Sequence, residues 1–276
     1  MAAAGEGDTL ARINDELRRQ GIDEAQKAGP WLALESNPDV FNDFCVRLGL
    51  PSGWGFVDVW GLEDEALSWI SGPVLACVVL FPCTARIYEE RRIEDGQLRR
   101  PGGPGAAVAP CTESDVFFLK QVIGFGNACG TIACLHAVAN CRPWLSLGRE
   151  APLEGIVSAQ AAASPEARGE ALLREPTLRS SSDAAARAEV AQTALPARDG
   201  PPLDHHFAAL VRSPAGRLVE LDGTKRVPVD HGATSAEHFL RDAARVLRGR
   251  FVDVDPDVHG FAFMALTRLE GEDKQL

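Results

Sequence analysis

The sequence lacks several features that would each assign it to a class of protein. No two of its seven cysteines have the CxxC spacing that is common in metal and redox sites. The first residues, MAAAGEGDTL, have neither the basic start nor the apolar stretch of a secretory signal. Basic residues are a minority, 28 against 39 acidic ones, so most of the surface would repel a phosphate backbone. We expect a cytoplasmic protein, with the nucleus as an alternative, and no nucleic-acid partner.

A long uninterrupted apolar run is also missing. Residues 66–85 carry no charge and approach the roughly 20 residues of a membrane span, but Gly72, Pro73 and Pro82 interrupt them. The longest uninterrupted part, VLACVVLF at 74–81, is short and rich in β-branched residues. This composition is typical of a strand buried on both faces, and we expect no contact with a membrane.

Helix and strand patterns are dispersed along the chain and favour one large α+β domain at residues 30–270. Residues 1–29 are an N-terminal extension with one short amphipathic helix, and residues 271–276 are a C-terminal tail. Helices are expected from Asn37 onward and at 62–70, 131–140, 164–175, 181–195 and 235–248. Strands are expected at 54–62, 74–81, 116–123, 205–211, 217–222 and within 259–268.

Two stretches have the composition of exposed connections. Residues 91–115 contain Arg91, Arg92, Arg99 and Arg100, followed by PGGPG, which no regular element accommodates. We interpret these arginines as solvated, with a binding patch as the alternative. Residues 175–182, EPTLRSSS, separate two helix patterns, and we expect them to be mobile and exposed.

One cysteine has a setting that favours chemistry. Cys129 lies in GNACGT, between small residues, directly before the helix pattern TIACLHAVAN. A thiol at a helix N-terminus faces unpaired backbone N–H groups and the positive end of the dipole, which stabilise a thiolate. The alternative, a small buried residue, is assigned to Cys45, Cys77, Cys134 and Cys141, which lie within apolar patterns. Cys129 is therefore the candidate nucleophile.

A catalytic thiolate needs a base, and the base needs a group that orients it. The strand patterns DHHFAALV and RLVELDG flank a turn, RSPAG, centred on Pro214. In a regular antiparallel hairpin about this centre, His206 and Asp222 lie directly opposite each other, with Cβ atoms roughly 5 Å apart. His205 would point to the other face. His206 and Asp222 are thus the candidate base and orienting group, and a surface His-Asp pair is the alternative.

Gln121 lies eight residues before Cys129 and is a candidate for a third role. Attack on a carbonyl creates an oxyanion, and a backbone N–H together with a side-chain amide can stabilise it. The backbone N–H of Cys129 and the amide of Gln121 suit this role by type. The alternative is an ordinary polar residue at the end of a strand.

Several blocks of this sequence together resemble the ubiquitin C-terminal hydrolase family, the papain-like thiol deubiquitinases. The resemblance covers residues 31–269 and rests on WLALESNPDVFNDFCVRLGL, WGFVDVWGLEDEAL, LFPCTA, KQVIG with NACGTIACLHAVAN, HF at 206–207, LVELDG and VPVDHGATS, in the family's order. It implies a papain-like cysteine protease fold with a central antiparallel sheet flanked by helices. It also implies a knotted chain path and a crossover loop over the active site, at about residues 165–181.

The same resemblance implies roles and partners. Cys129 would be the nucleophile, His206 the base and acid, Asp222 its orienting group and Gln121 the oxyanion donor, with no metal or cofactor. The protein would be a monomer whose partner is ubiquitin or a ubiquitin-like modifier. Its leaving groups would be small adducts or short peptides on the C-terminal glycine of ubiquitin.

One departure from the family pattern concerns the spacing of the Gln and the Cys. The family has QxIGNxC, whereas IGFGNAC in this chain adds two residues in the region of Gly124 to Gly126. Two extra residues can bulge outward as a Gly-flanked loop and leave Gln121 in place, because glycine permits unusual backbone angles. Alternatively they push Gln121 out of reach, which would give a ubiquitin-binding protein with a weakened or inactive site.

Overall fold

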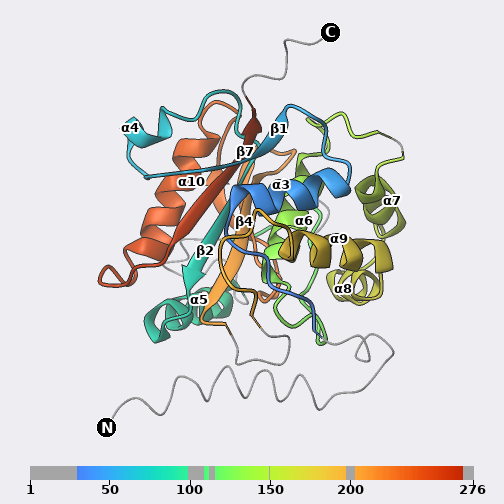
Figure 1. Ribbon diagram of the computed structural model, residues 1–276. Helices are drawn as coiled ribbons and strands as arrows, with labels where there is room; N and C mark the ends of the chain where they lie inside the picture. Colours follow the sequence, from blue (N-terminus) through green and yellow to red (C-terminus); the bar gives the residue numbers. More distant parts are fainter. Residues whose placement is uncertain (1–29, 99–108, 112–115, 149, 197–202, 270–276) are drawn as a thin grey trace.

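A computed structural model describes residues 30–98, 109–111, 116–148, 150–196 and 203–269 (Figure 1). The N-terminal extension, the C-terminal tail, and Arg99 and Arg100 lie outside the described residues. The described strands form one seven-stranded sheet in the order β1-β7-β2-β4-β5-β6-β3, and every neighbouring pair is antiparallel. The α+β class with a central antiparallel sheet is therefore confirmed.

The elements have the following bounds. The strands are β1 (Trp54–Asp58), β2 (Ala76–Pro82), β3 (Ala109–Pro110), β4 (His205–Arg212), β5 (Arg217–Leu221), β6 (Val229–Ala233) and β7 (Ala262–Arg268). The helices are α3 (Pro38–Arg47), α4 (Asp64–Leu67), α5 (Ala85–Leu98), α6 (Cys129–Cys141), α7 (Pro152–Ala159), α8 (Pro165–Leu173), α9 (Pro176–Ala186), α10 (Phe239–Leu247) and the π-helical η1 (Arg248–Val252).

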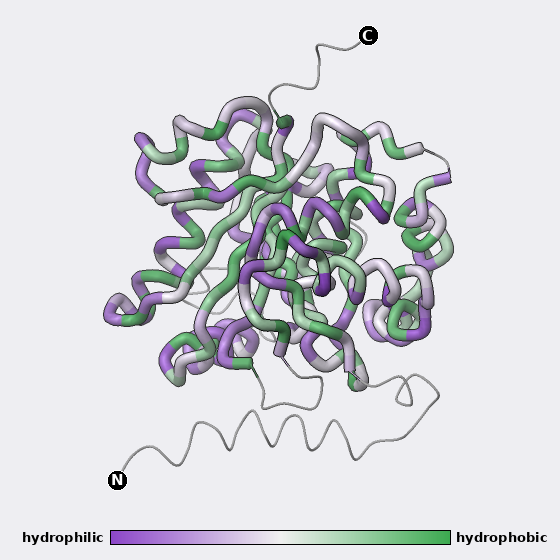
Figure 2. The backbone as a smooth tube through the Cα atoms, viewed as in Figure 1, coloured by the Kyte–Doolittle hydropathy of each residue, from purple (hydrophilic) through white to green (hydrophobic). Residues whose placement is uncertain are grey.

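Strand β2 illustrates how the sheet is covered on both faces. Its residues alternate between two hydrophobic cores: Ala76 and Val78 join the core beneath α3 and α6, and Cys77 and Val79 join the core beneath α10. This alternation follows from the two-residue period of a strand. In Figure 2 the central strands are mostly hydrophobic, and the outer helices alternate between hydrophobic and hydrophilic residues. Strand β2 thus accounts for residues 76–82 of the uncharged run at 66–85. No helix in the described ranges is long and apolar enough to span a bilayer.

Residues 116–123, expected to form a strand, lie outside the sheet, so that prediction is wrong. The backbone of this segment bonds to side chains of α6: the Phe117 N–H donates to Asn140 Oδ1 at 2.7 Å, and the Leu119 N–H donates to His136 Nε2 at 3.2 Å. Burial lowers the pKa of His136 to about 4, so its neutral ring can accept. These bonds replace the strand ladder that the apolar pattern had suggested.

Residues 91–98, expected to be an exposed loop, form the second half of helix α5. Arg91 is buried, at 9 % exposure, and not solvated. Arg92, one position on, is exposed and pairs with Glu89, as expected. The sequence pattern missed this helix because its buried face contains charged residues, Arg91 and Glu94, in place of apolar ones.

Residues 175–182, expected to be mobile and exposed, also form a helix in the structure. Helix α9 begins at Pro176, with the Glu175 side chain capping the N–H of Thr177, and it ends at Ala186. Leu178 and Ser182 are completely buried. The helix predicted at 181–195 is correspondingly wrong beyond Ala186. Ser164 caps α8 as predicted, and its hydroxyl accepts from the N–H of Ala167.

Candidate active site

Cys129 is the first residue of helix α6, as the sequence predicts. Helix α6 is buried on nearly all sides between the sheet and α3, whereas Cys129 at its N-terminus is partly exposed. Ala128 precedes it and provides no side-chain cap, so the first backbone N–H groups of the helix remain free to stabilise negative charge. Packing thus places a thiol at the edge of the core with the positive helix end behind it.

The other cysteines have the properties of structural thiols. Cys45, Cys134 and Cys141 lie fully inside the core, as expected. Burial raises the pKa of Cys77 to about 12 and that of Cys83 to about 11, so both remain protonated and weakly nucleophilic near neutral pH.

His206 lies near the start of β4 and joins Cys129 to Asp222. Its Nε2 is 2.8 Å from Asp222 Oδ1, and the Cys129 side chain lies near enough to the ring to contribute to its pKa. Because Asp222 engages Nε2, the nitrogen that faces the thiol is Nδ1. Burial of the ring opposes protonation, but the charge of Asp222, its hydrogen bond and the nearby Cys129 side chain outweigh it and raise the pKa of His206 to about 10. The ring is therefore an imidazolium at neutral pH.

Asp222 directly follows β5 and is only 1 % exposed. Its Oδ1 accepts from His206 and also from the backbone N–H and hydroxyl of Thr224, at 2.8 and 2.7 Å. Its Oδ2 accepts from Arg91 Nη2. Burial alone would raise the pKa of the carboxyl, but the charges of His206 and Arg91 hold it well below the usual range. Asp222 is thus a permanent anion.

The predicted hairpin register is wrong by two residues, although the predicted contact exists. The ladder pairs Ala209 with Leu221 and Arg212 with Leu218, so its centre lies one residue beyond Pro214. Because side chains on a strand alternate, a shift of two residues keeps His206 and Asp222 on the same face. Asp222 then reaches His206 from just past the end of β5. The ring of His205 bonds to Asp204, at 2.8 Å.

A buried network of charges behind Asp222 was missed by the sequence analysis. Arg91 Nη2 also donates to Glu220 Oε1 at 2.9 Å, and Glu220 further binds Lys225 Nζ and His231 Nε2, each at 3.0 Å. The signal that could have revealed it is the spacing of Glu220 and Asp222, two carboxylates on one face of an otherwise apolar strand. Because buried carboxylates require cations nearby, this spacing predicts that arginine or lysine side chains from elsewhere in the chain pair with them.

Three side chains of this network lie close enough together to hold a metal ion: Glu94, Glu220 and His231. Each carboxylate of this group is already paired with a cation of the chain itself through at least one oxygen, and Glu94 Oε1 has no hydrogen-bond partner among the described residues. Lys225 Nζ binds both Glu94 and Glu220, and Arg91 binds the latter as well. The group therefore has the chemistry of an internal ion-pair network.

The backbone of Gln121 bonds to the residue that follows Asp222. Its N–H donates to the carbonyl of Gly223, the residue after Asp222, at 2.9 Å. The side-chain Nε2 donates to the Gly126 carbonyl at 3.0 Å. The inserted Phe125 is 1 % exposed, so the outward bulge, one of the two alternatives, is wrong: the insertion turns inward and packs in the core.

A cavity of about 450 Å³ adjoins Cys129. Its walls include residues 33–36, 186, 191, 193–196 and 203–205. The Glu35 carboxylate accepts from the backbone N–H groups of Gln192 and Thr193, at 2.7 and 3.4 Å. The chain segment beside the thiol is therefore the one after α9. Residues 165–181, implied as the crossover loop, form α8 and part of α9, and the cavity lining includes none of them.

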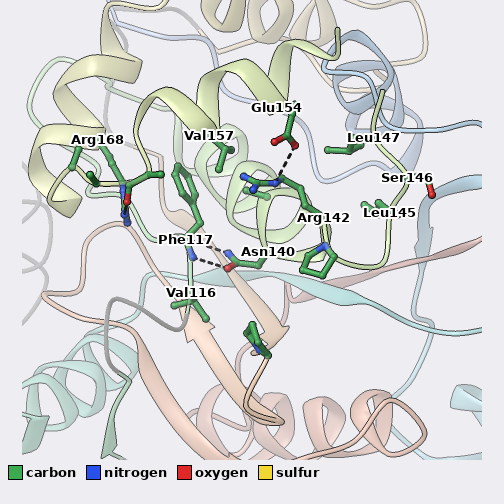
Figure 3. A pocket seen from close by; sticks show the side chains of 16 residues that line it. Val116, Phe117, Asn140, Arg142, Leu145, Ser146, Leu147, Glu154, Val157 and Arg168 are labelled. Atoms are coloured by element: carbon green, nitrogen blue, oxygen red, sulfur yellow. Dashed lines mark hydrogen bonds and ion pairs between the residues drawn. The ribbon is translucent and has the colours of Figure 1, made fainter. Parts of the chain in front are cut away.

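A second cavity, of about 710 Å³, lies at the far end of α6 (Figure 3). Most of its polar side chains bind one another or the backbone. Asn140 exchanges hydrogen bonds with the backbone of Phe117, and Arg142 Nε is 3.3 Å from Glu154. Arg168 donates to the Phe118 carbonyl at 2.9 Å. Because these groups are engaged, we place the reaction in the smaller cavity that contains Cys129.

Known proteins resemble this chain over most of its length. Residues 31–252 match the family model described as ubiquitin carboxyl-terminal hydrolase, family 1. The chain is 38% identical over 237 residues to a ubiquitin carboxyl-terminal hydrolase of Drosophila melanogaster, covering 86% of this chain and 97% of that protein. It is 35% identical over 235 residues to the human isozyme L1, covering 85% and 97%.

Solved structures show the same fold. The catalytic domain of Trichinella spiralis UCH37 bound to ubiquitin vinyl methyl ester superimposes with a TM-score of 0.66 at 20% identity. The match covers 87% of this chain and 97% of that one. The papain-like arrangement implied by the sequence blocks is consistent with this likeness, and the knotted chain path stays a prediction.

Proposed function

The chain belongs to the ubiquitin carboxyl-terminal hydrolase family, and from this premise we propose that it cleaves the bond at the C-terminal glycine of ubiquitin. The observation that carries the proposal is a helix-terminal thiol beside a largely buried imidazole that a permanent carboxylate orients. Cys129, His206 and Asp222 make this arrangement, and Cys129 lines a cavity. A structure of a relative with a ubiquitin vinyl methyl ester supports ubiquitin as the partner.

The first half of the proposed reaction forms a thioester. The Cys129 thiolate attacks the glycine carbonyl, and the carbonyl electron pair moves to the oxygen. The Cys129 N–H and the Gln121 amide donate to this oxyanion. As the tetrahedral species collapses, the bond to the leaving amine breaks and His206 gives that amine its proton from Nδ1. The imidazole is then neutral and still oriented by Asp222.

The second half releases ubiquitin. A water molecule loses a proton to the neutral His206 as its oxygen attacks the thioester carbonyl. Collapse of the second tetrahedral species expels the Cys129 thiolate and leaves the glycine carboxylic acid, which loses its proton to solvent while the released amine takes one up from solvent. The imidazolium and thiolate are restored, so the cycle balances without an external acid or base.

The walls of the cavity favour small leaving groups. Residues 193–196 and 203–205 lie beside Cys129, and Glu35 binds the backbone at Gln192 and Thr193. A folded protein attached to ubiquitin would have to displace this segment. Small adducts and short C-terminal peptides would not.

Hydrolysis of a fluorogenic ubiquitin amide tests the proposal, with Cys129→Ala as the matched control. We expect turnover by the wild type, none by the variant, and covalent labelling of the wild type alone by ubiquitin vinyl methyl ester. Ubiquitin binding without turnover or labelling would favour the alternative, a binding protein with an inactive site. Equal cleavage of ordinary peptides that lack ubiquitin would indicate a general peptidase and also contradict the proposal.

A further inference from the structure

The residues inserted between Gln121 and Cys129 form an ordered turn with a buried centre. The ring of Phe125 packs edge-on against Trp31, with centroids 5.1 Å apart. The Phe125 carbonyl accepts from the Trp31 N–H at 2.9 Å, and Gly126 pairs with Trp31 in a parallel bridge. Both the side chain and the backbone of the insertion are therefore attached to the core.

Glycine at one position of this turn is required for a close approach. Gly126 has a φ of +62°, which L side chains rarely adopt, and a Cβ there would lie 2.4 Å from the Cβ of Pro30. The backbone thus passes directly against Pro30, one residue before Trp31. This packing determines the direction of the Gly126 carbonyl.

That carbonyl accepts the hydrogen bond from the Gln121 side chain, at 3.0 Å from Nε2. A carboxamide nitrogen has two N–H groups, so one remains for another acceptor. Gln121 Oε1 is buried and has no hydrogen-bond partner among the described residues. A rotated amide would place Oε1 against the Gly126 oxygen, where two acceptors repel each other. The orientation of the amide is therefore defined by Gly126.

The geometry points to a role for the inserted turn as a positioning device for the oxyanion donor. The Gly126 carbonyl takes one N–H of the Gln121 amide and directs the other to the oxyanion that forms beside Cys129. Phe125 is then a positioning residue, because it acts through Gly126 and Gln121. This inference rests on the proposed function and specifies one part of its site.

A double-mutant cycle tests the inference with the full-length protein and a fluorogenic ubiquitin amide. We expect Gln121→Ala to lower kcat about a hundredfold, the usual effect of losing an oxyanion donor. Phe125→Ala should lower kcat about tenfold through misplacement of the amide, with KM changed less than about twofold. In the Gln121→Ala background, Phe125→Ala should change kcat less than about twofold, because the group it positions is gone.

Two further variants separate positioning from stability. Phe44→Ala removes an equally buried ring from α3 and should lower Tm while kcat stays within about twofold of wild type below the transition. Phe125→Leu keeps an apolar side chain in the core and should lower kcat less than Phe125→Ala does. If Phe125→Ala does not fold, Phe125→Leu takes its place in the cycle, and its smaller loss of kcat should likewise vanish in the Gln121→Ala background.

The outcomes are distinct. An equal loss of kcat from Phe125→Ala with and without Gln121 would overturn the inference and leave the proposed hydrolase intact. Unchanged kcat in Phe125→Ala would do the same. Absence of turnover in the wild type would overturn both the proposed function and this inference.

Discussion

Arg91 binds Asp222 from the side opposite to His206: its Nη2 donates to Oδ2, and His206 engages Oδ1. Helix α5 brings this arginine to the site from 131 residues away in the chain. Its guanidinium also lies 4.6 Å from the centroid of the Phe81 ring, and that ring packs edge-on against His206. Arg91 therefore contacts both the carboxylate of Asp222 and the Phe81 ring that packs against His206.

Replacement of Arg91 by methionine should destabilise the fold and weaken catalysis. The change leaves Glu220 and Asp222 buried without their shared cation, which typically costs about 3–5 kcal/mol. We expect a lower denaturant midpoint. For the folded fraction we expect a reduced kcat, because only Thr224 then remains to orient Asp222 toward His206. Chemical unfolding and ubiquitin amide hydrolysis measure the two effects.

Arg92 is the matched control for this prediction. It is adjacent in the sequence but exposed, and its partner Glu89 is exposed too. Arg92→Met should leave both the midpoint and kcat unchanged. Arg91→Lys should fall between Arg91→Met and wild type, because lysine keeps the charge and loses the planar fork. Equal effects of Arg91→Met and Arg92→Met would contradict the role assigned to Arg91.

The pH dependence of catalysis should depend on Asp222. The pKa of His206 is raised to about 10, so the imidazolium that protonates the leaving amine is present at neutral pH and is lost as the pH rises through about 10. In Asp222→Asn the charge that raises this pKa is absent, while burial still lowers it. The alkaline limb of kcat/KM should therefore move to lower pH by at least about one unit. A limb at the same pH in both proteins would refute this assignment.

Release of the segment after α9 should broaden the range of leaving groups. Glu35→Ala removes the acceptor of the hydrogen bonds from Gln192 and Thr193. Loss of hydrogen bonds to a charged acceptor should raise the population of the displaced segment roughly tenfold. We expect the variant to cleave a fusion of ubiquitin with a small folded domain faster, relative to its cleavage of the fluorogenic amide, than the wild type does. An unchanged ratio would mean that another contact holds the segment.

Two helical glycines should respond to alanine with opposite signs. Gly155 lies within α7 and a Cβ there meets nothing within 4 Å, so Gly155→Ala should stabilise the protein by up to about 1 kcal/mol. Gly169 lies within α8, and a Cβ there would lie 2.2 Å from the Lys120 carbonyl oxygen. Gly169→Ala should therefore destabilise by about 1–3 kcal/mol, against its helix propensity. Urea unfolding of both variants measures the difference; stabilisation by Gly169→Ala would show that α8 can move away.

Local sequence signals predicted the parts of the site that depend on neighbouring residues. The start of α6 at Cys129, the burial of β2 on both faces and the shared face of His206 and Asp222 all follow from short-range patterns. The predicted contact of His206 with Asp222 exists despite the error in register, because a shift of two residues leaves both side chains on the same face of the sheet. The apolar pattern at 116–123 failed, because its backbone bonds to side chains of α6 that no local pattern reveals.

The sequence by itself determined which residues we propose for the chemistry: a thiol at a helix start, a histidine and an aspartate on one strand face, and an upstream amide. Only the tertiary structure decided what surrounds them. Arg91 behind Asp222, the inward turn of Phe125 and the segment after α9 beside Cys129 each bring together residues far apart in the chain. Such contacts depend on which buried surfaces meet and which charges burial forces to pair, and a linear pattern contains neither.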